Sequence, residues 1–131
     1  ATTQILAGAD VLTGSSQQAI GAMRACAEYD DVLWVGQDIA QFETPEGQAK
    51  CVAASAYNYT AVVVGLIESL DEGVTGGVCI PMNFNNGGFI FEYNSALSDV
   101  VTDEIRAAVD EAISQFTASA GVLSNWADVQ I

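Results

Sequence analysis

A single aspartate, Asp38, follows a run of apolar residues that ends in a glycine. The run is Asp31-Val32-Leu33-Trp34-Val35, and Gly36-Gln37-Asp38 comes directly after it. Four consecutive apolar residues predict a strand covered on both faces, as in a parallel sheet. Ligands of open parallel sheets bind beyond the carboxyl ends of the strands, where a carboxylate accepts hydrogen bonds from hydroxyls or amines. We therefore predict that Asp38 contacts a ligand. The alternative is a loop aspartate that caps backbone amides.

Two further polar segments are expected at the same edge of the sheet. Ser15 and Ser16 follow a predicted strand at Ala9–Thr13 and precede a predicted helix from about Gln17 to Glu28. Amides at a helix N-terminus could hold a polar ligand group, although Ser16 as an ordinary N-cap explains the pattern equally well. Phe84 and Gly88 enclose a second loop, Phe84-Asn85-Asn86-Gly87-Gly88, whose glycines a turn alone would also explain.

The residue types weigh against an enzyme and against a metal site. The chain has no histidine, which removes the commonest general base. Glu43 and Glu46 could pair with Asp38 for glycosidic hydrolysis, but they flank Pro45 in a polar loop that favours solvated side chains. The three cysteines lack C-x-x-C spacing, so we expect neither zinc nor a cofactor. An α/β enzyme with Asp38 as general base remains the alternative.

Two of the cysteines are expected near the opposite edge of the sheet. Cys26 ends a predicted helix and Cys51 begins a predicted strand. If the flanking strands are neighbours, a Cys26–Cys51 disulfide is geometrically allowed in an oxidising compartment. The alternative is that all three cysteines are buried apolar thiols.

The charge of the chain excludes some partners. Three basic residues against 17 acidic ones give a formal net charge of −14 in 131 residues. Such a surface repels phosphate backbones and anionic lipids, so we expect neither nucleic acid nor a membrane surface as a direct partner. The acidic residues are best explained as a solubility shell, and a cationic partner surface is the alternative.

Helical and strand patterns alternate along the chain, which predicts an α/β fold with a mostly parallel, doubly wound sheet. After the elements named above, we expect a strand at Cys51–Ala54, a helix at Tyr57–Glu72 and strands at Val78–Ile80 and Phe89–Phe91. A last helix should begin after Thr102 and bury Ile105, Val109, Ile113 and Phe116. Because Ala1–Leu6 reads as the tail of a helix without its preceding strand, we expect a further segment upstream or a companion chain.

Taken in order, several stretches resemble the carboxyl-terminal half of the basic membrane protein family. They are Leu6–Leu12, Val35–Asp38, Val52–Tyr59, Gly76–Val78 and Gly87-Gly88 before Glu92-Tyr93-Asn94. The family consists of substrate-binding proteins of ABC importers and includes purine nucleoside receptors. The resemblance implies one incomplete lobe of a type I periplasmic-binding-protein-like fold within residues 1–131. About residues 9–81 would form the second lobe, and about 89–122 would return to the first.

The resemblance also assigns roles to the candidate residues. Asp38 matches the family aspartate that contacts sugar hydroxyls. Tyr57 stands where nucleoside-binding members carry lysine, so Tyr57 and Asn58 would offer an aromatic wall and an amide to a flat or sugar-like ligand. Aromatic packing at a helix start is the alternative reading of Tyr57.

The expected function is therefore a non-enzymatic solute-binding protein. It would close on a small polar ligand, nucleoside-like or sugar-like, outside the cytoplasm and deliver it to an ABC permease. A structural or assembly subunit that has lost ligand binding is a further alternative, and the absence of the family lysine at Tyr57 favours it.

Overall fold

The computed structural model describes residues 1–77 and 80–118, in two compact units. The first unit comprises Ala1–Ala56 and Phe91–Thr102, and the second comprises Tyr57–Ile90 and Asp103–Ile131. Val78 and Cys79, in the predicted strand Val78–Ile80, lie outside the described residues. The end of the segment of about residues 89–122, which was expected to return to the first lobe, also lies outside them.

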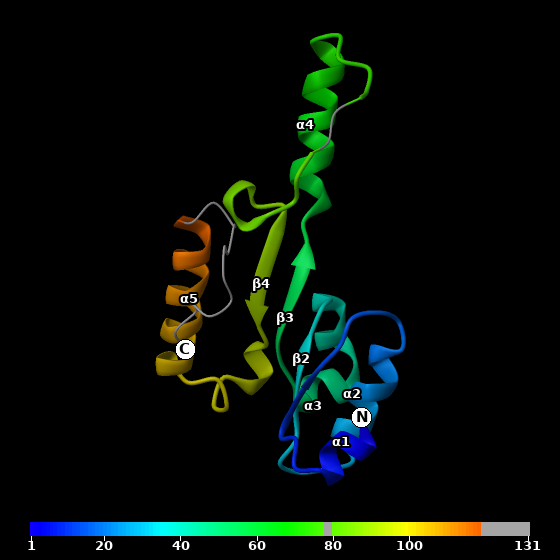
Figure 1. Ribbon diagram of the computed structural model, residues 1–131, viewed down its shortest axis with the longest axis vertical. Helices are drawn as coiled ribbons and strands as arrows, with labels where there is room; N and C mark the ends of the chain where they lie inside the picture. Colours follow the sequence, from blue (N-terminus) through cyan, green and yellow to red (C-terminus); the bar gives the residue numbers. More distant parts are fainter. Residues whose placement is uncertain (78–79, 119–131) are drawn as a thin grey trace. The chain divides into compact units, whose positions relative to one another are not determined.

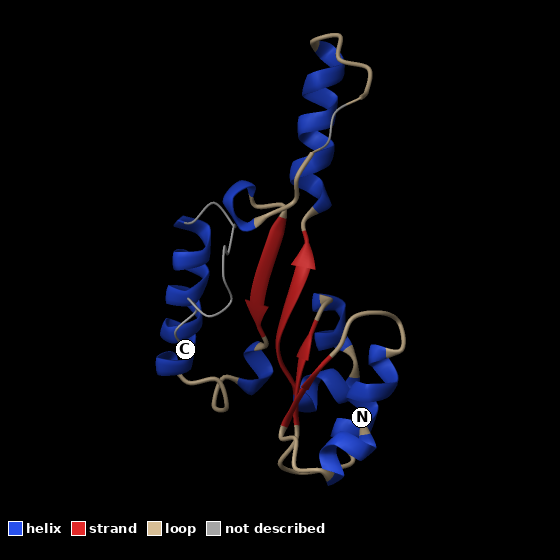
Figure 2. Ribbon diagram, viewed as in Figure 1, coloured by secondary structure: helices blue, strands red, loops and turns tan. Residues whose placement is uncertain are grey.

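Within the described residues, four strands form one sheet in the order β1-β2-β3-β4 (Figure 2). They are β1 (Val11–Thr13), β2 (Leu33–Gly36), β3 (Cys51–Tyr57) and β4 (Phe89–Tyr93). β1 pairs with β2 and β2 with β3 in parallel, with a register shift between Trp34 and Val35. Beside β3, backbone hydrogen bonds join Asn94 to Val52 and Asn58 to Gly88, so β4 runs antiparallel. The prediction of a mixed α/β fold with a mostly parallel sheet is confirmed.

The helical segments of the first unit lie beside its strands. They are α1 (Thr2–Leu6), α2 (Ala19–Ala27), the 3-10 turn η1 (Ile39–Glu43), α3 (Pro45–Lys50) and the 3-10 turn η3 (Ser95–Leu97). Helix α2 buries Ala19, Met23 and Cys26, which recur at helical spacing. These three join Leu12 of β1 and Trp34 of β2 in one apolar core. Trp34 is its largest fully buried side chain.

Burial alternates along β1 and β2, which corrects the expectation of a strand covered on both faces. Leu12 and Trp34 are buried, whereas Val11 is 52% exposed and Leu33 and Val35 are only partly buried. Side chains alternate across a strand, so the core covers one face more completely than the other. The run of apolar residues predicted the strand but not how far each of its two faces is buried.

The stretch after β2 was expected to be a long loop but contains η1 and α3. Thr44 is the N-cap of α3, and its Oγ1 accepts a hydrogen bond from the amide of Gly47 at 3.0 Å. Pro45 occupies the first helical turn, where its missing N–H costs nothing. Lys50 ends the helix and donates to the carbonyl oxygens of Tyr29 and Asp30, which fixes α3 to the segment before β2. The Thr-Pro-Glu sequence is the helix start signal that the prediction missed.

A buried amide, Asn94, ties the chain after β4 to α3 and β3. Its Nδ2 donates to the carbonyl oxygens of Gly47 at 3.1 Å and Cys51 at 2.9 Å, while its Oδ1 accepts from the amide of Ala96 at 3.0 Å. Asn94 is 4% exposed. With three hydrogen bonds it satisfies backbone groups that would otherwise be buried without partners.

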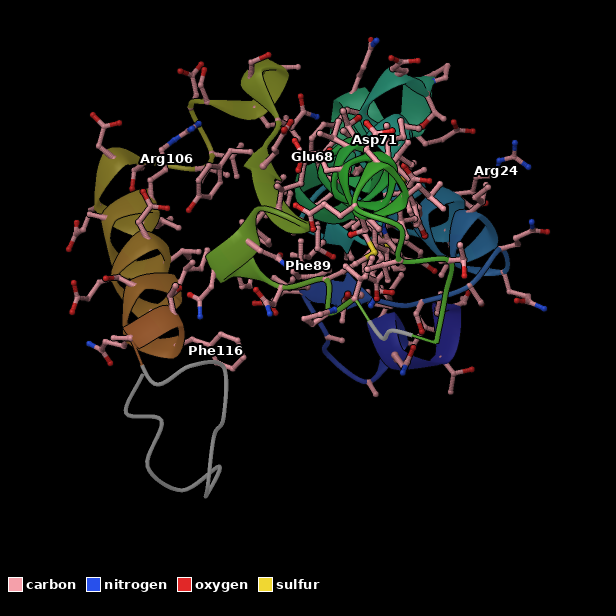
Figure 3. The ribbon with its side chains drawn as sticks, turned by 90° about the horizontal axis from the view of Figure 1, so that it is seen from above. Arg24, Glu68, Asp71, Phe89, Arg106 and Phe116 are labelled. Atoms are coloured by element: carbon pink, nitrogen blue, oxygen red, sulfur yellow. The ribbon has the colours of Figure 1, made fainter. Side chains whose placement is uncertain are left out.

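The second unit holds α4 (Tyr59–Asp71), the 3-10 turn η2 (Phe84–Asn86) and α5 (Asp103–Ala118). Tyr57 was expected in a helix but is the last residue of β3. The apolar residues that α4 was expected to pack are exposed: Val63 by 50%, Leu66 by 40%, Ile67 by 55% and Leu70 by 57%. Figure 3 shows α4 with its charged residues Glu68 and Asp71 labelled. The described part of the unit therefore covers these apolar side chains only partly.

Helix α5 begins as predicted, with Asp103 and Glu104 in its first turn. Its apolar stripe is not buried, contrary to prediction: Ile105 is 48% exposed, and Val109, Ile113 and Phe116 are partly buried. In the described chain, no helix is both long enough and apolar enough to span a bilayer.

Candidate ligand-binding pocket

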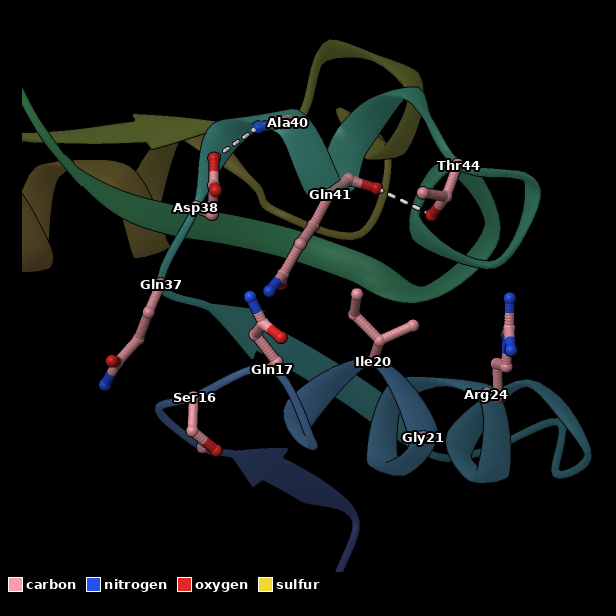
Figure 4. Close-up of a pocket in the computed structure, with 11 residues that line it drawn as sticks. Ser16, Gln17, Ile20, Gly21, Arg24, Gln37, Asp38, Ala40, Gln41 and Thr44 are labelled. Carbon is pink, nitrogen blue, oxygen red and sulfur yellow. Dashed lines mark hydrogen bonds between the residues drawn. The ribbon is translucent and has the colours of Figure 1, made fainter.

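A cavity of about 830 Å³ lies in the first unit, beyond the carboxyl ends of β1 and β2 (Figure 4). The β1–α2 connection and α2 contribute Gly14, Ser16, Gln17, Ile20, Gly21 and Arg24 to its lining. The segment after β2 contributes Gln37, Asp38, Ala40, Gln41 and Thr44. The cavity therefore lies at the edge of the sheet at which the sequence placed Asp38, Ser15 and Ser16.

Asp38 lines this pocket and also caps η1. Its side chain is exposed, and its Oδ1 accepts a hydrogen bond from the amide of Ala40 at 2.9 Å. The capping role, given above as the alternative, is thus present in the structure. Capping uses one carboxylate oxygen, and a carboxylate has several lone-pair positions, so the residue can still accept from a ligand hydroxyl or amine.

Gln41 projects from η1 towards Gln17, which precedes α2 (Figure 4). The indole Nε1 of the fully buried Trp34 donates to Gln41 Oε1 at 2.9 Å. The backbone carbonyl of Gln41 accepts from Thr44 Oγ1 at 2.8 Å. Both ends of Gln41 are therefore attached to fixed parts of the first unit.

Gly47 of α3 packs against the backbone of Gln41. A Cβ at this position would be 2.7 Å from the carbonyl carbon of Gln41, closer still to its oxygen, and 2.8 Å from Thr44 Oγ1. No side chain fits there without moving η1. The absence of a side chain at Gly47 allows α3 to support the pocket wall at van der Waals distance.

Arg24 supplies the positive charge of the pocket lining. Its Nε lies 3.3 Å from Oε1 of Glu46, and its side chain is 66% exposed. Figure 3 shows the guanidinium pointing outward from α2. A pair this exposed is screened by water and holds Arg24 weakly, so the guanidinium can turn towards an anionic or polar group in the pocket.

Of the two predicted serines, Ser16 is in the pocket lining, and neither serine caps α2. Ser16 lines the pocket, but it adopts φ 108° and does not cap a helix. Helix α2 begins only at Ala19, and Gln18 precedes it without a side-chain capping bond. Ser15 is adjacent in sequence and is not part of the lining.

The remaining predicted residues belong to the second unit, where the structure brings them together. Ring centroids of Tyr57 and Phe89 are 5.2 Å apart, and those of Phe84 and Phe89 are 5.0 Å apart. The backbone N–H of Asn58 donates a hydrogen bond to the backbone carbonyl of Gly88 at 2.9 Å. Tyr57 is 56% exposed, so one part of its ring is open to solvent. A ligand contact for these four residues remains a prediction.

The two described cysteines, Cys26 and Cys51, show no sign of a bridge or of catalytic activation. Cys26 and Cys51 are buried free thiols, so the disulfide considered for them is not formed. Burial raises the pKa of the Cys26 thiol and raises the pKa of Cys51 to about 11. Both therefore stay protonated and weakly nucleophilic at neutral pH. In the described residues, no group of three or more His, Cys, Asp or Glu side chains is arranged to hold a metal ion.

Five polar residues of the lining were not among the predicted site residues: Gln17, Arg24, Gln37, Gln41 and Thr44. Thr44 had a detectable signal, since it precedes Pro45 as an N-cap does. The others are polar residues on a helix or in a loop, where polarity alone does not distinguish a pocket from solvent.

Comparison with known proteins identifies no relative. No protein-family model matches the chain, and neither a curated protein nor a solved structure matches it. The resemblance to the basic membrane protein family therefore rests on the sequence stretches given above.

Proposed function

We propose that the protein is a solute-binding module that holds a small polar ligand, nucleoside-like or sugar-like, without converting it. The observation that carries this proposal is the pocket at the carboxyl ends of β1 and β2, with Asp38 in its lining. Pockets for small molecules in α/β sheets occur at this edge, with volumes of about 300–1,000 Å³.

The chemistry of the lining supports a neutral, polar ligand. Ser16, Gln17, Gln37, Gln41 and Thr44 carry uncharged groups that both donate and accept hydrogen bonds. A ligand rich in hydroxyl or amide groups can exchange its water for these partners. Asp38 adds a charge-assisted acceptor, which favours a hydroxyl or amine at that point.

The resemblance to the basic membrane protein family supports the finer part of the proposal. On that reading, the chain contributes to a lobe of a type I periplasmic-binding-protein-like fold. It would work outside the cytoplasm, close over its ligand with a second lobe and pass the ligand to an ABC permease.

Catalysis by paired carboxylates receives less support from the geometry. Asp38 is the carboxylate among the pocket-lining residues. Glu46 and Glu43 both lie outside the pocket lining, and Glu43 is exposed. Glycosidic hydrolysis needs two carboxyl groups on either side of the scissile bond. The described pocket supplies one of them.

The test compares Asp38→Asn with the unaltered chain by isothermal titration calorimetry against adenosine, inosine, uridine, ribose and glucose. Asparagine caps helices about as well as aspartate, so the melting temperature should change little while affinity falls by about tenfold. Asp71→Asn on α4 removes the same charge outside the pocket and should leave binding unchanged. No binding of any of the five compounds by the unaltered chain, or equal affinity of Asp38→Asn, would contradict the proposal.

A second candidate, a structural or assembly subunit, is supported by the exposed apolar residues of α4. Val63, Ile67 and Leu70 are each at least 50% exposed. Apolar patches on a helix commonly mark a protein–protein contact. Size-exclusion chromatography with light scattering separates the candidates: a stable oligomer that binds none of the five compounds favours the assembly role.

A further inference from the structure

The strongest unexplained feature of the pocket is the hydrogen bond between Trp34 and Gln41. An indole N–H can only donate, so its partner in Gln41 must be the amide oxygen. The bond is 2.9 Å long, and Trp34 is fully buried. A buried N–H without an acceptor is costly, so the amide of Gln41 is held in one of its two orientations.

The surroundings of the amide reinforce this orientation. A Cβ at Gly36 would collide with Gln41 Oε1, so the glycine leaves the space that the amide oxygen occupies. The backbone carbonyl of Gln41 accepts a hydrogen bond from Thr44 Oγ1, which fixes the backbone from which the side chain starts. Within residues 1–77 and 80–118, no acceptor takes the Nε2 hydrogens of Gln41.

We propose that Gln41 is a specificity-determining residue that presents a fixed hydrogen-bond donor to the ligand. This inference rests on the proposed binding function. An unconstrained glutamine adapts to donors and acceptors alike by rotating its amide. Gln41, whose Oε1 is engaged by Trp34, offers the Nε2 donor to the pocket, and Asp38 offers acceptor oxygens.

The two residues together define the class of ligand. The preferred ligand carries a hydroxyl or amine donor for Asp38 and a carbonyl oxygen or unprotonated ring nitrogen for Gln41. A nucleoside has both kinds of group, whereas a simple sugar has hydroxyls alone. Hydroxyl oxygens can also accept a hydrogen bond from Gln41, so sugars can bind, but with fewer well-matched hydrogen bonds.

The deciding variant is Gln41→Glu, which keeps an oxygen for Trp34 and removes the donor. We expect Kd for the tightest-binding of the five compounds to rise at least about fivefold. One hydrogen bond to the ligand is lost, and the new carboxylate oxygen faces the ligand acceptor that Nε2 had bound. Gln41→Met removes the donor without adding charge and should weaken binding similarly. Gln48→Glu, on the exposed surface of α3 outside the pocket lining, is the control for added charge.

Exchange of the Trp34 indole N–H, followed by nuclear magnetic resonance, separates a loss of ligand contact from a loss of structure. The Trp34 indole N–H should exchange slowly with solvent in both the unaltered chain and Gln41→Glu, because the acceptor is retained. Lost affinity with a protected indole supports the proposal. Unchanged affinity of Gln41→Glu, or loss confined to Gln41→Glu with Gln41→Met normal, overturns it while the binding function stands. Failure of the unaltered chain to bind any compound overturns both.

Discussion

Replacing Gly47 by alanine tests whether α3 supports the pocket wall. The added Cβ would be 2.7 Å from the carbonyl carbon of Gln41, whereas an ordinary contact is at least 3.4 Å. Because the carbonyl oxygen of Gln41 is closer still than its carbon, the space between α3 and η1 must open by more than about 0.7 Å. The obstructing atoms belong to the Gln41 backbone and the Thr44 capping hydroxyl, and neither is the end of a flexible side chain.

The expected loss of stability follows from the contacts that this movement disturbs. Overpacking costs about 1–3 kcal/mol. Displacing α3 also weakens the Thr44 cap and the hydrogen bond from Asn94 to the Gly47 carbonyl, each with a value of about 1 kcal/mol. Alanine returns up to about 1 kcal/mol through its higher helix propensity. We expect the free energy of unfolding to fall by about 2–4 kcal/mol.

Gly21→Ala is the matched control, since Gly21 also lies in a helix but has nothing within 4 Å of an added Cβ. It should be neutral or stabilising by up to about 1 kcal/mol. Urea unfolding of the whole chain, followed by circular dichroism, measures both variants. A Gly47→Ala protein within about 0.5 kcal/mol of the unaltered chain would show that the close approach of α3 to Gln41 is not real.

Three further predictions concern the core and the exposed helix. Asn94→Asp should lower the free energy of unfolding by about 2–4 kcal/mol at pH 7, because both Nδ2 donors are lost and a carboxylate faces two carbonyls. The loss should be smaller at pH 4, where a protonated acid can donate, and equal stability of the two proteins at pH 7 in urea unfolding would refute the role of this amide. The pKa of Cys51 is about 11 in the fold against 9.0 as the ordinary value, so the unfolded chain releases its proton first as the pH rises. Stability should therefore fall between about pH 9 and pH 11, and Cys51→Ala should show a smaller fall over this range in alkaline unfolding curves. A double change, Val63→Gln with Ile67→Gln, should reduce binding of the dye ANS without lowering the melting temperature, because both side chains are at least 50% exposed. Unchanged dye fluorescence would mean that α4 is already covered.

The sequence by itself determined most of the element order. The apolar run before Gly36 predicted β2, and the polar residues after it predicted a site at the carboxyl edge of the sheet. Asp103 and Glu104 marked the start of α5 correctly. These features are local: strand and helix periodicities and capping residues act within a few positions of the chain.

The tertiary structure decided which polar residues became a pocket and which apolar ones became a core. Nothing near Gln41 in sequence indicates that its amide meets the indole of Trp34, because the contact depends on η1 folding back over β2. The apolar spacing of α4 predicted burial equally well for a covered or an uncovered helix. Periodicity specifies a face, and only a packed neighbour can bury it. For this reason Met23 of α2 is fully buried while Ile67 of α4 is 55% exposed, although both lie on apolar helix faces.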